Sequence, residues 1–158
     1  MTVLILHNIR SVHNVGSIFR TADAAGVSKI FLTGYTPTPL DRFNRERKDF
    51  VKVSLGAEKS VPWETAAQLA PVLKKLKKDG YEIVAIEQSK KSTSLFDYKP
   101  AKSASRRIAV IMGNEVLGIS PQSLKYADHI LEIPMHGTKE SLNVSVAAGI
   151  ALFALTRI

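Results

Sequence analysis

The chain closes with the stretch ILEIPMHGTKESLNVSVAAGIALFAL, residues 130–155. Its first part, 130–133, is short and apolar like a buried strand, and it stops at Pro134. A polar loop with Gly137 follows and leads into an almost entirely apolar helix over 144–155. Such a helix has to be buried on most sides, by its own sheet or by a second subunit, and the pattern leaves both open. It is far shorter than the roughly 20 apolar residues that span a bilayer, so we expect no membrane partner.

Upstream of this stretch, short runs rich in Val, Ile and Leu alternate with helical patterns. The runs predicted as strands are 3–7, 29–33, 82–87, 108–112 and 130–133. The predicted helices are 15–25 (Asn14 as N-cap, Gly26 as stop), 71–80, 121–127 (Ser120 as cap, Pro121 at the first position) and 144–155. Apolar strands that alternate with helices are typical of a parallel sheet. We therefore predict an α/β fold, a parallel sheet flanked by helices, in a single domain over 1–158.

Composition narrows the chemistry. The 158 residues include no cysteine, which excludes disulfides, thiolate nucleophiles and cysteine zinc sites and suits a reducing compartment. The beginning lacks the features of a signal peptide, so we expect a cytoplasmic location. The four histidines lack metalloprotease spacing and have no cysteine partners, so we expect no metal. The nucleophile-elbow motif of serine hydrolases is also missing from the sequence, which argues against hydrolysis as the activity. The net charge of +8 favours a polyanionic partner over a basic surface kept for solubility.

The segment 34–62 shows no clear periodicity and is predicted to be a long loop. Its basic residues alternate with Phe43 and Phe50, a mixture that suits phosphate contact and base stacking. The candidate RNA-binding residues are Arg42, Arg45, Arg47 and Lys48, together with Arg10 upstream. The alternative is a solvated loop whose aromatic side chains dip into the core.

Three polar clusters interrupt the apolar pattern, each at a predicted strand-to-helix junction, where open α/β sheets bind ligands. They read NIRSVHNVGSIFR over 8–20, MGNEVLGIS over 112–120 and IPMHGTKESLNVS over 133–145. Each has a plain structural alternative: Asn14 as a cap, a tight turn at Gly113, and Ser141 as a cap. No phosphate-loop or dinucleotide fingerprint is present.

In this order, the three clusters resemble the three motifs of the SpoU (TrmH-type) branch of the SPOUT methyltransferases. The resemblance extends from Asn8 to about Leu155, and the closing S-L-N-V-S is its strongest part. Val116 departs from the family, which commonly has glycine after the glutamate, and this is expected to loosen the turn slightly. The resemblance implies an RNA methyltransferase that uses S-adenosylmethionine. It also implies a C-terminal deep trefoil knot that forms the cofactor pocket, and a homodimer whose interface contains the last helix.

The resemblance also assigns residues by motif position. The adenosine of the cofactor is expected to contact the backbone of Gly113, Ile133 and Leu142. Met135 is expected nearby, and Glu87 is expected to line the same pocket. Arg20 is the expected catalytic residue, supported by Asn14, and the other active-site polar positions are Glu115, Ser141 and Asn143.

The implied reaction is methylation of a ribose 2′-hydroxyl. A sulfonium donor already carries a good leaving group, so no metal is required, but the hydroxyl needs its proton removed or its oxyanion stabilised. Arginine side chains hold their proton strongly, so Arg20 acts either as an unusual base or by orienting the hydroxyl and stabilising negative charge. As the target, tRNA is favoured over rRNA. The rival interpretations are a non-catalytic RNA-binding or ribosome-assembly factor that retains the fold, another nucleotide-binding α/β enzyme, and methylation of a base.

Overall fold

A parallel sheet forms the centre of the molecule. The structure is a computed structural model that describes residues 1–99 and 106–156. In these residues seven strands pair in the order β3-β2-β1-β6-β4-β7-β5, and every adjacent pair is parallel. The strands are β1 (Thr2–His7), β2 (Lys29–Thr33), β3 (Trp63–Ala66), β4 (Glu82–Ile86), β5 (Thr93–Ser94), β6 (Ile108–Met112) and β7 (His129–Glu132). The central strands β1 and β6 are almost fully buried, as their unbroken apolar composition predicts.

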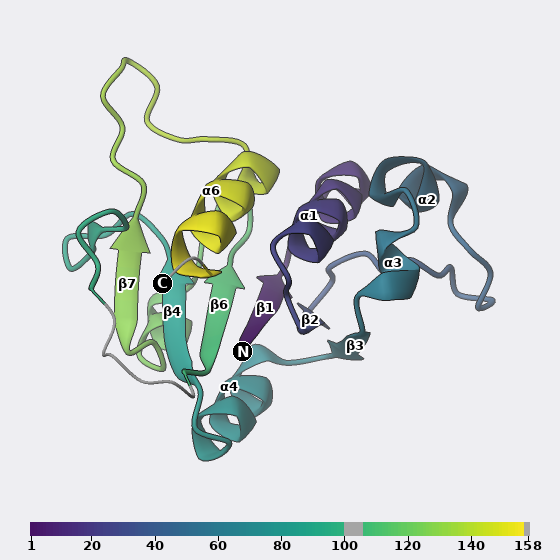
Figure 1. Cartoon of the computed structure of the whole chain (residues 1–158), viewed down its shortest axis with the longest axis horizontal. Coiled ribbons are helices and arrows are strands. Elements are labelled where there is room, and N and C mark those ends of the chain that lie inside the picture. Colours follow the sequence, from purple (N-terminus) through teal and green to yellow (C-terminus); the bar gives the residue numbers. More distant parts are fainter. Residues whose placement is uncertain (100–105, 157–158) are drawn as a thin grey trace.

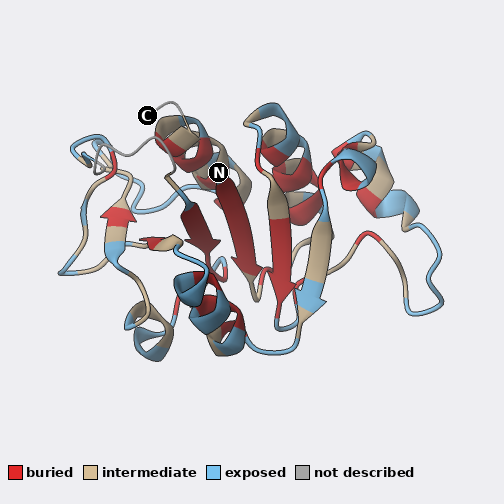
Figure 2. Cartoon of the chain, turned by 60° about the horizontal axis from the view of Figure 1, so that its bottom comes forward, coloured by how far each residue is buried: buried red, intermediate tan, exposed pale blue. Residues whose placement is uncertain are grey.

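Helices cover both faces of this sheet (Figures 1 and 2). They are α1 (Val12–Ala24), α2 (Lys48–Ser54), α3 (Ala57–Ser60), α4 (Leu69–Lys78), α5 (Pro121–Leu124) and α6 (Val144–Thr156). Leu4 and Leu6 of β1 pack in the core that α1 and α6 share, whereas Val3 and Ile5 pack in the core beneath α4. Side chains alternate between the two faces of a strand, so one short strand contributes to both cores.

The five strands predicted from apolar runs are confirmed to within one residue at their ends. The two missed strands, β3 and β5, lie at opposite edges of the sheet and have only four and two residues. The predicted end of α5 is wrong, since this helix stops at Leu124, but its cap is confirmed: Ser120 Oγ accepts a hydrogen bond from the Ser123 N–H. Apolar periodicity therefore predicts central strands better than short edge strands.

The start of the first helix is a correction. α1 begins at Val12, and its N-cap is Ser11, whose Oγ accepts from the Asn14 N–H at 3.2 Å. Asn14 therefore lies within the first turn, and its side chain is available for contacts outside the helix. Gly26, with a φ of 72°, follows the end of α1 as predicted.

The segment 34–62 is only partly a loop, because α2 and α3 lie within it. Its two phenylalanines differ in burial. Phe50 on α2 is fully buried and packs edge-on against Phe19 of α1, with the ring centroids 5.2 Å apart. Phe43 is 61% exposed. The core alternative is therefore right for Phe50, and only Phe43 is accessible to a ligand.

The last helix, α6, combines two apolar faces. Ala148, Ala151 and Leu152 on one face are fully buried in the core, whereas Val146 and Phe153 are exposed. Burial by the helix's own sheet therefore accounts for one face, and an apolar face is left on the surface. Within the described part of the chain, no helix has the length and apolar character needed to cross a membrane.

Two helical glycines at close helix contacts give the first prediction. A Cβ on Gly16 of α1 would lie 3.1 Å from the Phe50 carbonyl oxygen and 3.2 Å from Val53 Cβ, whereas one on Gly149 of α6 would meet Thr21 Cγ2 at 3.5 Å. We expect Gly16→Val to lower the free energy of unfolding by about 1–3 kcal/mol through overpacking. The matched Gly149→Ala should leave it unchanged or raise it by up to about 1 kcal/mol, because alanine favours helix. Urea unfolding at one fixed protein concentration measures both, and equal stabilities would contradict a tight α1–α2 contact.

Candidate active site

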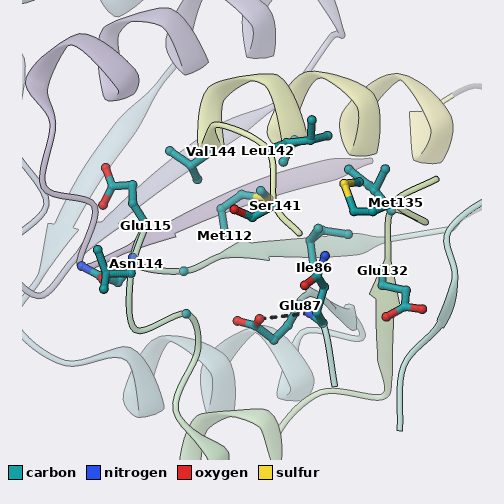
Figure 3. A pocket seen from close by; sticks show the side chains of 16 residues that line it. Ile86, Glu87, Met112, Asn114, Glu115, Glu132, Met135, Ser141, Leu142 and Val144 are labelled. Atoms are coloured by element: carbon teal, nitrogen blue, oxygen red, sulfur yellow. Dashed lines mark hydrogen bonds between the residues drawn. The ribbon is translucent and has the colours of Figure 1, made fainter. Parts of the chain in front are cut away.

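A cavity of about 280 Å³ opens where β4, β6 and β7 end (Figure 3). Its floor includes Ile86, Met112 and Glu132, the last residues of these strands. All five residues expected to bind the cofactor line it, namely Glu87, Gly113, Ile133, Met135 and Leu142. Glu115 and Ser141 from the expected active-site set also line it. Parallel strands bring their carboxyl ends to one edge of the sheet, so residues separated by more than 50 positions meet here.

Backbone forms a large part of the cavity wall because two glycines cannot carry a side chain. A Cβ on Gly113 would lie 2.5 Å from Ile119 Cγ1 and 2.7 Å from the Gly118 carbonyl carbon. Gly118 has a φ of 64°, and a Cβ there would collide with the Glu87 carboxylate. The turn between β6 and α5 is thus packed tightly against the end of β4, and it presents peptide groups to a ligand.

Glu87 and Gln88 hold two loops to the end of β4. Glu87 Oε2 accepts the Ile119 N–H at 2.7 Å, so this carboxylate fastens the turn that contains Gly118. Gln88 Nε2 donates to the Glu140 carbonyl at 2.7 Å and fastens the loop that precedes α6. Gln88 also lines the cavity, although sequence reasoning missed it. Its position directly after Glu87 at a strand end is the only sequence signal for it.

The buried side chain of Asn114 is a second residue that sequence reasoning missed. Its Nδ2 donates to the Asn8 carbonyl at 2.8 Å and to the Tyr35 hydroxyl at 2.9 Å. Its Oδ1 accepts the N–H groups of Val116 at 2.8 Å and Leu117 at 2.7 Å. The turn expected to be loosened by Val116 is therefore held by the side chain of Asn114. Val116 itself lies outside the left-handed region, so glycine is not needed there.

The three motifs meet through one carboxylate and two amides. Glu115 accepts hydrogen bonds from the Arg10 N–H at 3.0 Å, the Ser11 N–H at 3.3 Å and Asn14 Nδ2 at 3.2 Å. Asn14 Oδ1 in turn accepts from Asn143 Nδ2 at 3.2 Å. The predicted polar residues of all three motifs, apart from Arg20 and Ser141, are thereby joined in one hydrogen-bonded chain.

The charge state of Glu115 follows from these donors. Partial burial raises the pKa of Glu115, but the Arg10 N–H, its own N–H, the Asn14 amide and the Ser11 N–H outweigh burial and hold the pKa below its ordinary value. The carboxylate is therefore ionised at neutral pH and acts as an acceptor for three donors of the first motif.

Asn143 also begins the last helix. Its Oδ1 accepts the Ser145 N–H at 2.8 Å, and its carbonyl accepts the Ala147 N–H at 2.9 Å. The alternative of capping by Ser141 is therefore wrong, since Asn143 is the cap and Ser141 lies exposed on the cavity wall.

Arg20 lies apart from this cavity. It is exposed on α1 and lines a second, separate hollow of about 390 Å³ with His13 and residues of α2. It lies six positions after Asn14, a rise of about 9 Å along the helix axis. Within one chain, Asn14, Glu115, Ser141 and Asn143 gather around the first cavity, and Arg20 does not join them.

The basic residues proposed for RNA contact lie on the surface. Arg45 pairs with Asp41 at 2.8 Å, and Arg47 pairs with Asp49 at 2.9 Å. The guanidinium carbons of Arg42 and Arg45 lie 4.7 and 5.0 Å from the centre of the Phe43 ring. Lys48 and Arg10 are exposed, although the Arg10 backbone is fixed by Glu115. In residues 1–99 and 106–156, no three potential ligands gather as a metal site would require.

The family assignment follows from the whole chain. The SpoU rRNA Methylase family matches residues 1–153. The chain belongs to the SpoU family. In solved structures, the AdoMet-bound rRNA methyltransferase from Sinorhizobium meliloti has a TM-score of 0.85 at 29% identity, over 99% of this chain and 56% of that one. The TrmH/SpoU tRNA modifying enzyme of A. aeolicus has a TM-score of 0.82 at 29% identity, over 99% and 74%. The parallel sheet with flanking helices is thus the fold of SpoU relatives.

Two curated SpoU relatives share the name 23S rRNA (guanosine-2'-O-)-methyltransferase RlmB. The protein from Neisseria meningitidis is 37% identical over 150 residues, which are 95% of this chain and 56% of the relative. The protein from Escherichia coli is 35% identical over 155 residues, 98% of this chain and 59% of the relative. The chain therefore spans little more than half the length of the curated relatives it matches.

The lowered pKa of Glu115 gives the second prediction. A carboxyl with a lower pKa in the folded than in the unfolded state stabilises the fold above its unfolded pKa, and the effect is lost as pH falls through the folded pKa. We therefore expect Glu115→Gln to lower the free energy of unfolding at pH 7, with a difference that shrinks between about pH 5 and pH 3. Urea unfolding at both ends of this range measures it. A loss of stability in Glu115→Gln that does not change with pH would contradict an ionised Glu115 carboxylate that holds these donors.

Proposed function

We propose that this chain transfers the methyl group of S-adenosylmethionine to a ribose 2′-hydroxyl of RNA. The observation that carries the proposal is the cavity at the ends of β4, β6 and β7, because all five residues assigned to the cofactor from the motifs line it. The AdoMet-bound relative from Sinorhizobium meliloti, which superposes on nearly the whole chain, supports the same use of the fold.

The cavity lining fits the proposed donor. Met112, Ile133, Met135 and Leu142 provide an apolar wall for a flat adenine ring, and the bare backbone at Gly113 provides peptide groups for its polar edge. Three glutamates, Glu87, Glu115 and Glu132, are among the residues that line the same cavity, which suits a cationic ligand. When bound, S-adenosylmethionine supplies an activated methyl group on a positively charged sulfur.

The acceptor side is proposed to be the hydrogen-bonded group of Asn14, Glu115 and Asn143, together with Ser141 on the cavity wall. Glu115 is already surrounded by donors, so we propose that it positions Asn14 and the Arg10–Ser11 backbone and does not take the proton itself. Ser141, exposed on the wall, is available to the ribose. Arg20 is proposed to orient the hydroxyl and to stabilise the negative charge that develops on its oxygen, because a guanidinium keeps its proton.

A homodimer and a C-terminal trefoil knot complete the proposal. The exposed apolar face of α6, with Val146 and Phe153, is proposed to pack against a second copy. Because Arg20 does not line the cavity of its own chain, its proposed role requires the assembled dimer with RNA bound. The knot, a single domain and a cytoplasmic location remain predictions from the sequence.

The class of RNA is the least constrained part of the proposal. The predicted preference for tRNA has no support from the curated relatives, which are named for 23S rRNA, whereas the A. aeolicus relative is named a tRNA modifying enzyme. The deciding experiment offers the chain labelled S-adenosylmethionine with total tRNA and, separately, rRNA, followed by nucleoside analysis. A labelled 2′-O-methylnucleoside supports the proposal. Cofactor binding without transfer to either pool contradicts catalysis by this chain alone, and absence of cofactor binding favours the non-catalytic RNA-binding factor.

The third prediction concerns Arg20. Because it lies outside the cavity, Arg20→Ala should bind S-adenosylmethionine as the wild type does, measured by calorimetry. Methyl transfer should fall by a factor of about 100 or more, the usual loss when a charge-stabilising donor is removed. Arg20→Lys keeps the charge but loses the forked guanidinium, and it should recover only part of the rate. Undiminished transfer by Arg20→Ala would refute the assignment.

The fourth prediction concerns the basic loop. In the described residues, Arg42 and Lys48 form no ion pair, whereas Arg45 and Arg47 are held by Asp41 and Asp49. We expect Arg42→Gln with Lys48→Gln to weaken RNA binding and to reduce the salt slope by up to about 2, roughly one per lost phosphate contact. Fluorescence anisotropy at several salt concentrations measures this. The control Lys74→Gln with Lys75→Gln, on exposed positions of α4, removes equal charge and should change the slope little. Equal effects of the two pairs would assign the binding to net charge alone.

A further inference from the structure

One buried asparagine beside the cavity binds three residues that have exposed, largely apolar side chains. Asn114, on the cavity wall, binds the Tyr35 hydroxyl through Nδ2 and the N–H groups of Val116 and Leu117 through Oδ1. Tyr35 is 58% exposed, Val116 75% and Leu117 82%. Three hydrogen bonds from this one residue thus hold the Tyr35 hydroxyl and the backbone that carries the Val116 and Leu117 side chains.

The backbone that carries Tyr35 is held from the other side by Asn8. Asn8 lies in the left-handed region at φ 56°, and its Oδ1 accepts the Tyr35 N–H at 3.2 Å. Its Nδ2 lies 3.2 Å from His7 Nε2. Burial lowers the pKa of His7, so the ring is neutral and Nε2 can accept this hydrogen bond. Gly34 precedes Tyr35 at φ 67°, and a Cβ there would collide with the Asn8 side chain.

Thr36 secures the following residue. Its buried hydroxyl oxygen accepts the Ile9 N–H at 3.2 Å and lies 2.9 Å from the carbonyl oxygens of both Leu6 and Thr33, which share its single proton. The turn after β2 is therefore fixed on both sides of Tyr35, and it packs against Asn8, a non-glycine residue in the left-handed region just after β1. Such strained backbone persists where the surrounding structure determines it, and it is frequent at binding sites.

The position of this turn relative to the active site suggests its ligand. Asn114, which holds the Tyr35 hydroxyl, is followed directly by Glu115, which holds Asn14. Val116 lines the cavity proposed for the methyl donor. Arg10 is exposed, and it lies two positions after Asn8; its backbone N–H donates to Glu115. An aromatic ring, two apolar side chains and a cation close to the reacting hydroxyl fit a nucleobase and its phosphate.

We propose that Tyr35 is the stacking platform for a nucleobase at the acceptor site, with Val116 and Leu117 contacting the same nucleotide. This inference rests on the proposed function, because it takes the cavity beside Asn114 as the place of methyl transfer. A second copy of the chain is the competing occupant. The exposed face of α6 already offers an apolar surface for it, and the net charge of +8 favours RNA over an equally basic partner.

The test distinguishes base stacking on the Tyr35 ring from a purely structural role of the Tyr35 hydroxyl. Tyr35→Ala removes the ring, whereas Tyr35→Phe keeps the ring and removes only the hydroxyl bound by Asn114. If Tyr35 stacks on a base, Tyr35→Ala raises KM for RNA about ten-fold or more, since base stacking on aromatic residues is worth that much. Tyr35→Phe then stays within about three-fold of the wild type, and S-adenosylmethionine binding is unchanged in both. The matched control Phe96→Ala, at another exposed aromatic residue, should leave KM unchanged.

A binding measurement makes the test independent of catalysis. Anisotropy compares a fluorescent decamer of uridines with one whose central residue is abasic. The wild type should bind the abasic decamer several-fold more weakly, and Tyr35→Ala should bind both alike. If this holds while methyl transfer fails, the platform stands and the proposed function does not.

Three outcomes would overturn the platform. Equal losses in Tyr35→Phe and Tyr35→Ala would show that the hydroxyl only scaffolds the Asn114 turn. Equal discrimination against the abasic decamer by wild type and Tyr35→Ala would place the base elsewhere. A change in oligomeric state of Tyr35→Ala, measured by light scattering, would assign the ring to an interface between copies.

Discussion

The ionised carboxylate of Glu115 connects segments that lie more than 100 residues apart. It follows β6, and it receives the Arg10 and Ser11 N–H groups before α1 and the Asn14 amide within α1. Asn14 then reaches Asn143, which caps α6. This carboxylate ties the start of α1 to the turn after β6, and Asn114 reinforces the link through the Asn8 carbonyl. The relative positions of three motifs thus depend on one charged group with several donors.

The parallel sheet explains why the remaining lining residues meet. β4, β6 and β7 are neighbours in the sheet and all end at the same edge, although 82–86, 108–112 and 129–132 are separate in sequence. The loops after them are then fixed by side chains from that edge, with Glu87 holding the Gly118 turn and Gln88 holding the loop before α6. Because Gly113 and Gly118 leave no room for a Cβ, the resulting wall is partly peptide backbone. A ligand recognised through such a wall is recognised by shape and peptide hydrogen bonds more than by side-chain charge.

The features that could be predicted from the sequence are those encoded within one short segment, such as an apolar run or a motif. Five strands follow from apolar runs, and the ordered motifs identified five residues that line the cavity and are proposed to bind the cofactor. The cap of α1 was misassigned because Ser11 and Asn14 are both good capping residues, and the choice depends on Glu115 binding Asn14 from a distant segment. Asn114 was missed for a similar reason, since its four partners come from three segments. The burial of Phe50 depends on Phe19 of another helix, which no pattern within 34–62 contains.

Asparagine suits these junctions because its amide donates and accepts at once. Asn14 donates to Glu115 and accepts from Asn143, while Asn114 donates to Asn8 and Tyr35 and accepts from two N–H groups. Aspartate at either position would present oxygen where a donor is required, and it would add a charge beside Glu115. A neutral crosslink avoids both costs. It also leaves the electrostatics around the cavity to the glutamates among its lining residues and to the exposed arginines outside it, an arrangement that would draw the proposed cationic donor and polyanionic acceptor to different sides of one site.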